Sequence, residues 1–286
     1  MDIILNVLNQ TLVFTVPLLV VALGGMFSER SGVVNIALEG IMIGGALLSL
    51  LHAFAAINLK ADQTISGTAI NMLAPGLGLF LAKLIFNGNS SVPFSNTFRI
   101  HEIPVLSQIP ILGPILFKGA YITTYLGIVI LILSVIFLNK TKAGLRLRAC
   151  GENPQAADAA GVSVYKYRYM GVLLSGFLGG IGGLIYIIPI STVFNSDVGG
   201  YGFLALAILI FGNWQPYRIA TASLFFGIMK TLAYTYTAIP FLSALGFPSV
   251  VYKLIPYVAT LILLAFTSKN SAAPKASGIP YDKSKR

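Results

Sequence analysis

Long apolar runs recur along the chain, and most are close to the length that a helix needs to cross a lipid bilayer. Such a helix takes about 20 mostly apolar residues, because only a backbone that is hydrogen-bonded within itself is stable in hydrocarbon. The qualifying stretches are residues 5–26, 33–57, 64–86, 120–138, 169–190, 201–212, 219–237 and 250–267. Residues 201–212 are too few to cross alone. The sequence predicts an all-α fold, a polytopic membrane helix bundle of about eight spans.

Composition excludes a water-soluble fold. Hydrophobic residues make up 56% of the chain and charged residues only 10%, whereas soluble domains contain about 25% charged residues. No linker divides the apolar part, so we expect one transmembrane domain, residues 1–267, followed by a basic tail, residues 268–286. The first apolar run lacks the basic start and the cleavage site of a signal peptide, so we expect it to remain as a helix.

The net charge of +10 is carried by short segments between the apolar runs. This distribution is typical of membrane topology signals and not of a nucleic-acid surface. Residues 139–168 are predicted to be cytoplasmic because they contain Lys140, Lys142, Arg146, Arg148, Lys166 and Arg168. The tail is also basic, and simple alternation of eight spans puts both ends of the chain in the cytoplasm.

Two segments of the chain repeat one spacing of apolar and small residues. The spacing is that of Ala37, Leu38, Ile41 and Gly44, and again of Ala205, Leu206, Leu209 and Gly212. Each group follows a glycine-containing turn, which predicts an internal repeat with glycine-broken helices of the kind that expose backbone groups to a solute. The first half is short by about one span if the two halves are equivalent.

The first of these segments contains Glu39, the sharpest candidate for a functional residue. A carboxylate within a span is costly unless it is paired, protonated or facing water, so such residues often line a solute pathway. Asn35 lies four residues earlier, on the same helical face. The alternative is a structural role, in which Glu39 only bonds a neighbouring helix near the interface, with Asn35 or Arg30 as candidate partners.

Three further residues are candidates for the substrate pathway. The amide of Asn71, in the third span, either reads a polar solute or bonds a neighbouring helix. Tyr201 and Phe203 either stack on a ring of the solute or belong to an aromatic belt at the membrane interface. The predicted pathway therefore comprises Asn35, Glu39, Asn71, Tyr201 and Phe203.

The chain lacks the patterns of an enzyme. One cysteine, Cys150, excludes an internal disulfide and a cysteine metal cluster, and His52 and His101 have no partners at metal-ligand spacing. No nucleotide-binding lysine motif or nucleophile elbow is present. We predict no catalytic residue, metal or cofactor, and an ATP-driven role would require an ATPase on a separate chain.

Two glycine- and alanine-containing stretches have different predicted roles. The small residues of 175–183 recur at spacings of three and four, which favours close helix packing. In the basic segment, Pro154 suits a helix start, Ala156 to Ala160 suit the helix, and Gly161 suits its end. This short helix either docks in a groove of a partner or lies passively on the surface.

Residues 27–40, 60–67 and 144–148, with the segment that runs on to residue 162, resemble signature stretches of bacterial ABC importer permeases. The resemblance is to the nucleoside-type branch of the branched-chain amino acid and simple-sugar permease superfamily, and it covers nearly the whole chain. Relatives are expected to carry a longer stretch between the counterparts of Gly44 and His52, which implies a ninth span in full-length relatives.

The resemblance implies a multi-pass permease of the bacterial plasma membrane that imports nucleosides. Its implied partners are an ATP-binding cassette ATPase, a second homologous permease subunit and an extracytoplasmic substrate-binding lipoprotein, with membrane lipids around it and no nucleic acid. The segment resembling the ATPase-coupling helix supplies Glu152, Asn153, Pro154, Ala156, Ala157, Asp158 and Gly161.

Three alternatives remain at this point. One is a permease for a simple sugar such as ribose. Another is an ion- or proton-coupled secondary transporter in which Glu39 is the coupling group. The third is an inactive structural subunit, raised by the missing stretch.

Overall fold

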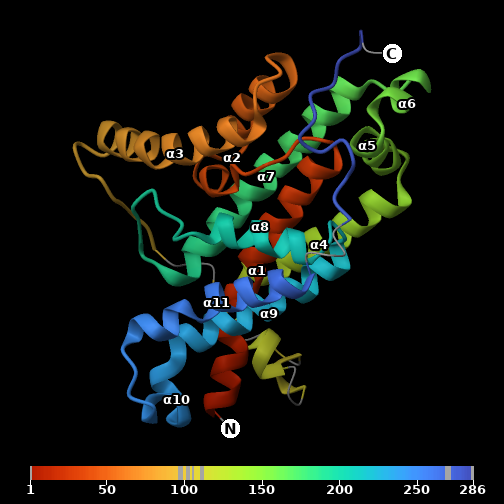
Figure 1. Ribbon diagram of the computed structural model, residues 1–286. Helices are drawn as coiled ribbons and strands as arrows, with labels where there is room; N and C mark the ends of the chain where they lie inside the picture. Colours follow the sequence, from red (N-terminus) through yellow and green to blue (C-terminus); the bar gives the residue numbers. More distant parts are fainter. Residues whose placement is uncertain are drawn as a thin grey trace.

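The computed structural model describes residues 2–95, 99–100, 104, 106–109, 113–267 and 272–284. It is a bundle of helices (Figure 1), namely α1 (Asp2–Arg30), α2 (Leu38–Ala53, continued by a π-helical turn at Phe54–Asn58), α3 (Gln63–Ile85), α4 (Ile122–Lys140), α5 (Lys142–Glu152), α6 (Pro154–Ala159), α7 (Val164–Ile190), α8 (Tyr201–Phe211), α9 (Pro216–Thr235), α10 (Pro240–Ala244) and α11 (Ser249–Thr267). Short strands β1 (Val92–Pro93) and β2 (Val193–Phe194) pair antiparallel. The predicted helical membrane bundle is confirmed.

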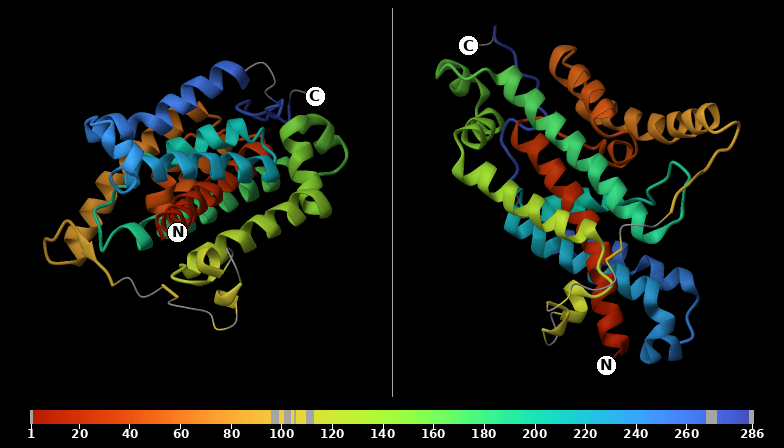
Figure 2. Two further views of the ribbon diagram at one scale, coloured as in Figure 1. Left: turned by 90° about the horizontal axis from the view of Figure 1, so that it is seen from below. Right: turned by 180° about the vertical axis from the view of Figure 1, so that it is seen from behind.

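Helix α1 runs through the middle of the bundle, between α7, α4 and α9 (Figure 2). Small residues allow the close approach of α7, because a Cβ added to Gly171 or Gly182 would collide with α1. The glycine run of 175–183 therefore serves helix packing, as predicted. By length and composition, α1, the stretch Leu38–Asn58, α3, α4 and α7 are able to cross a membrane, whereas α8 is short.

The bundle has two ends of different character (Figure 1). Helices α5 and α6 lie at one end, called here the α6 end, together with residues 272–284 of the tail. The amide of Ala276 donates to the carbonyl of Gly151 (2.8 Å), and Lys60 pairs with Asp282 (3.1 Å). The basic segments thus meet at one end, as a common cytoplasmic side requires.

The stretch predicted to cross as residues 33–57 instead folds back on itself. Up to Met42 it runs in the same direction as α7, and after Gly45 it runs in the opposite direction. In chain order, the contacts with α7 are Ser31 with Gly171, Asn35 with Ser175, Met42 with Gly183, Gly45 with Gly180, Ser49 with Gly176 and Asn58 with Tyr169. We call residues 38–58 the α2 hairpin.

Gly45 makes this reversal. Its φ of 55° and ψ of −139° are outside the helical region and are open mainly to glycine. Both arms of the α2 hairpin therefore return to the α6 end, and the N-terminus lies at the opposite end from the C-terminal tail (Figure 1). The prediction of both chain ends on one side was wrong, because alternation counted the α2 hairpin as a crossing.

The loop predicted at residues 87–118 contains β1 and two short helical turns, Leu106–Gln108 and Gly113–Phe117. Its prolines Pro93, Pro104 and Pro114 are among the described residues, whereas Pro110 lies outside them. Pairing of β1 with β2 joins the segment after α3 to the segment after α7.

Candidate functional site

Helix α8 lies against α1 and α2, and its first residues, Tyr201 and Gly202, are buried (Figure 1). Gly199 and Gly200 have φ values of 61° and 78°, a left-handed conformation that glycine adopts without steric cost. The amide of Gly199 donates to the carboxylate of Asp197 (2.9 Å). This loop therefore leaves the first amides of α8 pointing into the bundle, where each needs an acceptor.

Glu39 supplies that acceptor from the α2 hairpin. Its Oε1 accepts from the amide of Gly200 (2.7 Å) and its Oε2 accepts from the amide of Gly202 (2.6 Å), and the residue is only 8% exposed. A carboxylate at a helix N-terminus also complements the helix dipole. Glu39 therefore bonds a neighbouring helix, as the structural alternative has it, although its partners are backbone amides at the start of α8 and not Asn35 or Arg30.

A lysine and tyrosines surround the start of α8. The Nζ of Lys230, in α9, lies 4.7 Å from the ring centroid of Tyr201 and 5.5 Å from that of Tyr257. The rings of Tyr201 and Tyr186 have centroids 4.0 Å apart. Tyr201 is 1% exposed, and its buried hydroxyl has no hydrogen-bond partner among the described residues. We call Glu39, Tyr186, Tyr201, Lys230 and Tyr257 the α8 cluster.

Sequence reasoning missed Lys230, Tyr186 and Tyr257. The sequence did contain one signal for this site, namely that Lys230 falls within the predicted span 219–237. A cation in a span is as informative as the carboxylate of Glu39, since both are costly in hydrocarbon. Their proximity to Tyr201 depends on tertiary packing of four helices and has no local signature.

The structure separates the remaining predicted pathway residues. Asn71 fixes the start of α2, because its Oδ1 accepts from the amide of Gly40 (2.8 Å) and its Nδ2 donates to the carbonyl of Ile36 (2.8 Å). Asn35 donates to the hydroxyl of Ser175 (2.8 Å), on α7. Phe203 is 53% exposed and faces away, because residues two apart on a helix point in nearly opposite directions.

A cavity of about 480 Å³ lies elsewhere, beside the turn of the α2 hairpin. Its lining is apolar or glycine throughout: Met42, Ile43, Gly44, Gly45, Val92, Phe94, Gly180, Gly183, Leu184, Ile187, Ile188 and Phe194. It offers no polar side chain to orient a polar solute. The α8 cluster, with its amine and hydroxyl, is therefore the better candidate for solute recognition.

The predicted short helix is present as α6 at the end of the bundle. Asn153 is its N-cap, accepting from the amide of Ala156 (3.0 Å), Pro154 is its first residue, and Gly161 ends it with a φ of 77°. The exposed side chains of this stretch include Glu152 and Ala156. Asp158 is half-buried. These residues fulfil the local pattern of proline start and glycine stop.

Ala157 differs from its neighbours on α6. It is buried against Cys150, Val164 and Tyr281, so it packs within the chain and is not positioned to contact a partner. The same packing encloses the thiol of Cys150. Burial raises the pKa of this thiol to about 11, although Arg168 nearby opposes the shift. Cys150 is therefore a structural cysteine of low reactivity.

Comparison with known sequences identifies the chain. The family described as the permease component of branched-chain amino acid transport systems matches residues 41–265. The chain belongs to this permease family. The match and the long apolar helices make it a multi-pass cell-membrane protein and a transport subunit.

Individual relatives extend the match over the whole permease. The chain is 42% identical to the guanosine ABC transporter permease protein NupQ of Bacillus subtilis over 98% of this chain and 97% of NupQ. Identity to the nucleoside ABC transporter permease protein NupC of Lactococcus lactis is also 42%, with the same coverage. The Lactococcus permease protein NupB is 23% identical over 82% of this chain. No solved structure matches.

The alignment with NupQ bears on the missing stretch. It spans 312 positions, more than the 286 residues of this permease, so NupQ has residues without a counterpart here. The existence of extra residues in a relative agrees with the expectation from the resemblance. Their placement between Gly44 and His52 stays a prediction.

Proposed function

We propose that this chain is the membrane-spanning permease subunit of an ABC importer for nucleosides. The observation that carries the proposal is the 42% identity to NupQ and to NupC over nearly the full length of each chain. NupQ is named for guanosine and NupC for nucleosides. ATP hydrolysis would take place on a separate ATPase chain.

The α8 cluster is the proposed solute contact. A nucleoside presents a flat base and a ribose with hydroxyl groups. The unpartnered hydroxyl of Tyr201 and the amine of Lys230 suit hydrogen bonding to polar groups. The ring of Tyr201 is enclosed by Tyr186 and Lys230, so stacking on a base requires these side chains to separate in another state of the transporter. Glu39 holds the α8 backbone at this place. Asn71 and Asn35 would shape the pathway by fixing the start of α2, and Phe203 is left out because its ring faces outward.

The proposed partners follow from the same family. An ATPase would dock on α6, a second permease subunit would complete the pathway, and an extracytoplasmic lipoprotein would deliver the solute. Lactococcus lactis has two permease proteins, NupC and NupB, that both resemble this chain, which supports a pair of unlike permeases.

Uptake measurements test the proposal. Vesicles containing the complete complex and internal ATP should import labelled guanosine or uridine with the proton and sodium gradients collapsed. Ribose uptake that nucleosides do not compete for would favour the sugar permease. Transport that persists without the ATPase would favour an ion-coupled transporter, and no uptake by a correctly assembled complex would favour an inactive subunit.

Docking on α6 is tested separately by two alanines. Ala156→Arg places bulk and charge on the exposed face of α6, where mismatched charge at an interface costs several kcal/mol, on the order of 2–5. We expect normal amounts in the membrane but loss of ATPase co-purification and uptake. Ala157→Arg is the matched control, because that side chain is buried within the chain, and it should lower the amount of permease itself.

A further inference from the structure

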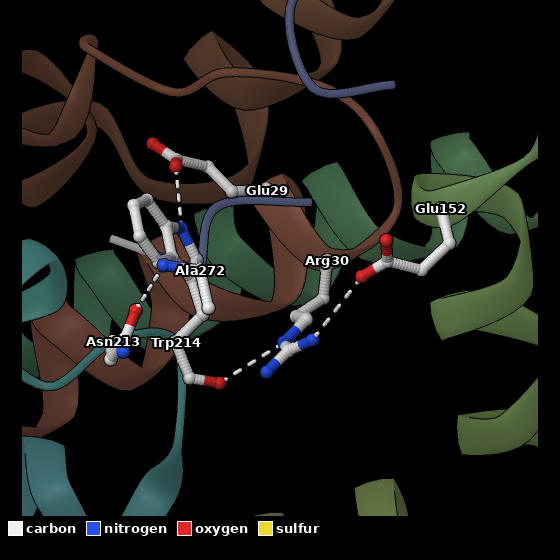
Figure 3. Close-up of polar contacts among 6 residues, drawn as sticks. All are labelled: Glu29, Arg30, Glu152, Asn213, Trp214 and Ala272. Carbon is white, nitrogen blue, oxygen red and sulfur yellow. Dashed lines mark hydrogen bonds and ion pairs between the residues drawn. The ribbon is translucent and has the colours of Figure 1, made fainter. Parts of the chain in front are cut away.

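Besides its anchor at the α8 cluster, helix α8 has contacts at its far end, which Figure 3 shows. The turn after it contains Asn213 and Trp214, with φ values of 51° and 54°. Two successive non-glycine residues in the left-handed region are uncommon and persist only where surrounding contacts hold them. The indole of Trp214 donates to the carboxylate of Glu29 (2.6 Å), and the carbonyl of Trp214 accepts from the Nε of Arg30 (3.0 Å).

Arg30 also reaches toward the α6 end. Its Nη1 lies 3.7 Å from the Oε1 of Glu152, the last residue of α5. The next residue, Asn153, is the N-cap of α6. Backbones approach closely at the same place, because a Cβ on Gly151 would collide with the carbonyl of Arg30. One side chain therefore joins the start of α6 to the turn that ends α8.

The helix between the two anchors is short and stiff. Its 11 residues span roughly 16 Å, with Gly200 and Gly202 held by Glu39 at one end and Trp214 just beyond the other. Because the hydrogen bonds of a helix are internal, a displacement imposed at Trp214 moves Tyr201 with it. Helix α7 also follows α6 in the chain, and both α7 and α8 pack against α1 and the α2 hairpin. What distinguishes α8 is the side-chain link from the turn at its end, through Arg30, to Glu152.

We propose that Arg30 and Trp214 are positioning residues that couple movement of α6 to the α8 cluster, with α8 as the connecting element. The inference rests on the proposed function as an ABC importer permease. Removing Arg30 breaks the link between Glu152 and the carbonyl of Trp214, whereas the indole stays bonded to Glu29 and Asn213 still accepts from Ala272. The turn therefore keeps its place in the bundle, but α8 no longer follows α6. ATP hydrolysis then continues without a matching movement at the solute site.

The test uses the complete complex in vesicles and measures ATP hydrolysed and nucleoside imported in the same sample. Arg30→Ala should lower import about tenfold, the effect of losing a hydrogen bond to a charged donor, with ATPase co-purification and hydrolysis retained. Glu152→Ala removes the ion pair and should lower import by a smaller factor. Because Glu152 also belongs to the segment predicted to dock the ATPase, the comparison requires that ATPase co-purification is unchanged. Arg218→Ala is the control, because it removes one exposed positive charge near the same turn.

Trp214 provides a second readout, since it is the only tryptophan of the chain. Its emission is obtained by subtracting the signal of the same complex with Trp214→Phe. Trapping the ATPase with vanadate should change this emission in the wild type and not in Arg30→Ala. If Arg30→Ala does not reach the membrane, Glu152→Ala decides, because the Glu152 side chain is 44% exposed and its loss leaves the packing intact.

Two results would overturn the inference. One is a normal ratio of ATP hydrolysed to nucleoside imported in both Arg30→Ala and Glu152→Ala. The other is a vanadate response of Trp214 that is the same in these variants as in the wild type. If the wild-type complex imports no nucleoside, the proposed function fails, whereas the Trp214 response still tests the coupling through Arg30.

Discussion

Helices α2 and α8 both begin inside the bundle, and their starts are capped in different ways. At α2, the amide of Gly40 donates to the neutral side chain of Asn71. At α8, the amides of Gly200 and Gly202 donate to the carboxylate of Glu39, which itself belongs to α2. A side chain of α2 thus caps the start of α8.

The two helices also end differently. After Gly45, α2 turns back along the glycines of α7 and returns to the end from which it came. Helix α8 continues to the turn at Trp214, where it meets Arg30. Helix α2, which turns back along α7, thus has a neutral cap, Asn71. Helix α8, which bonds Glu39 at its start and meets Arg30 just after its end, has a charged cap with Lys230 nearby. The predictions below test this contrast, from the largest expected effect to the smallest.

Loss of the charged cap should have the largest effect. Glu39→Ala leaves the amides of Gly200 and Gly202 without their acceptor. The loss is at least about 3 kcal/mol, since a hydrogen bond to a charged group contributes about 1.5 kcal/mol or more. We expect both the amount of permease in the membrane and uptake to fall strongly. Membrane amounts by immunoblot and uptake per permease measure the two effects separately.

A milder change separates structure from transport at the same residue. Glu39→Gln keeps one carbonyl oxygen as an acceptor and removes the charge. We expect uptake to fall more than the amount of permease, because the position of α8 is altered while most of its cap remains. Equal loss of both would mean that Glu39 has a structural role alone.

The next largest effect is expected from a substitution at Gly45, in the turn of the α2 hairpin. Gly45→Ala forces a side chain onto a backbone conformation that only glycine adopts readily, at a cost of about 1–3 kcal/mol. Thermal denaturation of the purified protein should show the loss. Gly76→Ala is the matched control, since Gly76 lies within α3, is not among the glycines with a positive φ, and has open space around it.

The neutral cap should matter less than the charged one. Asn71→Ala removes one hydrogen bond to Gly40 and one to Ile36, at a cost of about 1 kcal/mol each. Asn71→Asp keeps an acceptor for Gly40 but turns a carboxylate oxygen toward the carbonyl of Ile36, so it should not recover the loss. A stability loss for Asn71→Ala as large as that for Glu39→Ala would contradict the contrast between the two caps.

The smallest effect is expected at Cys150, away from both helix starts. With a pKa of about 11, its thiol forms far less thiolate near neutral pH than an ordinary cysteine does, by roughly 100-fold. Maleimide should therefore leave the folded protein almost unlabelled and label it after denaturation. Rapid labelling of the folded protein would show that the packing around Ala157 opens.

Sequence reasoning succeeded where the signal is local. Apolar length predicted the membrane helices, and the proline and glycine around α6 predicted its start and its end. The α2 hairpin was missed because residues 33–57 are apolar enough to cross, and the reversal depends on one glycine and on the glycines of α7 beside it. Neither feature changes the local hydropathy.

The candidate site was predicted in part. Glu39 and Tyr201 were chosen for their residue type, and the structure places both at the start of α8. The partners of Glu39 were not predictable, because backbone amides 161 and 163 residues away leave no mark near residue 39. Phe203 was chosen with Tyr201 for chemistry alone, and helical geometry turns it outward.

Because of the α2 hairpin, the side of the membrane on which each later segment lies does not depend on how many residues the chain has at the turn of the hairpin. The hairpin as a whole starts and finishes at the α6 end, so it contributes an even number of passages, whether it is shallow or deep. Residues inserted at Gly45 would lengthen the two arms as a pair and turn one shallow fold into two full crossings. A longer relative would then differ by two in its count of passages, and every other helix would keep its direction.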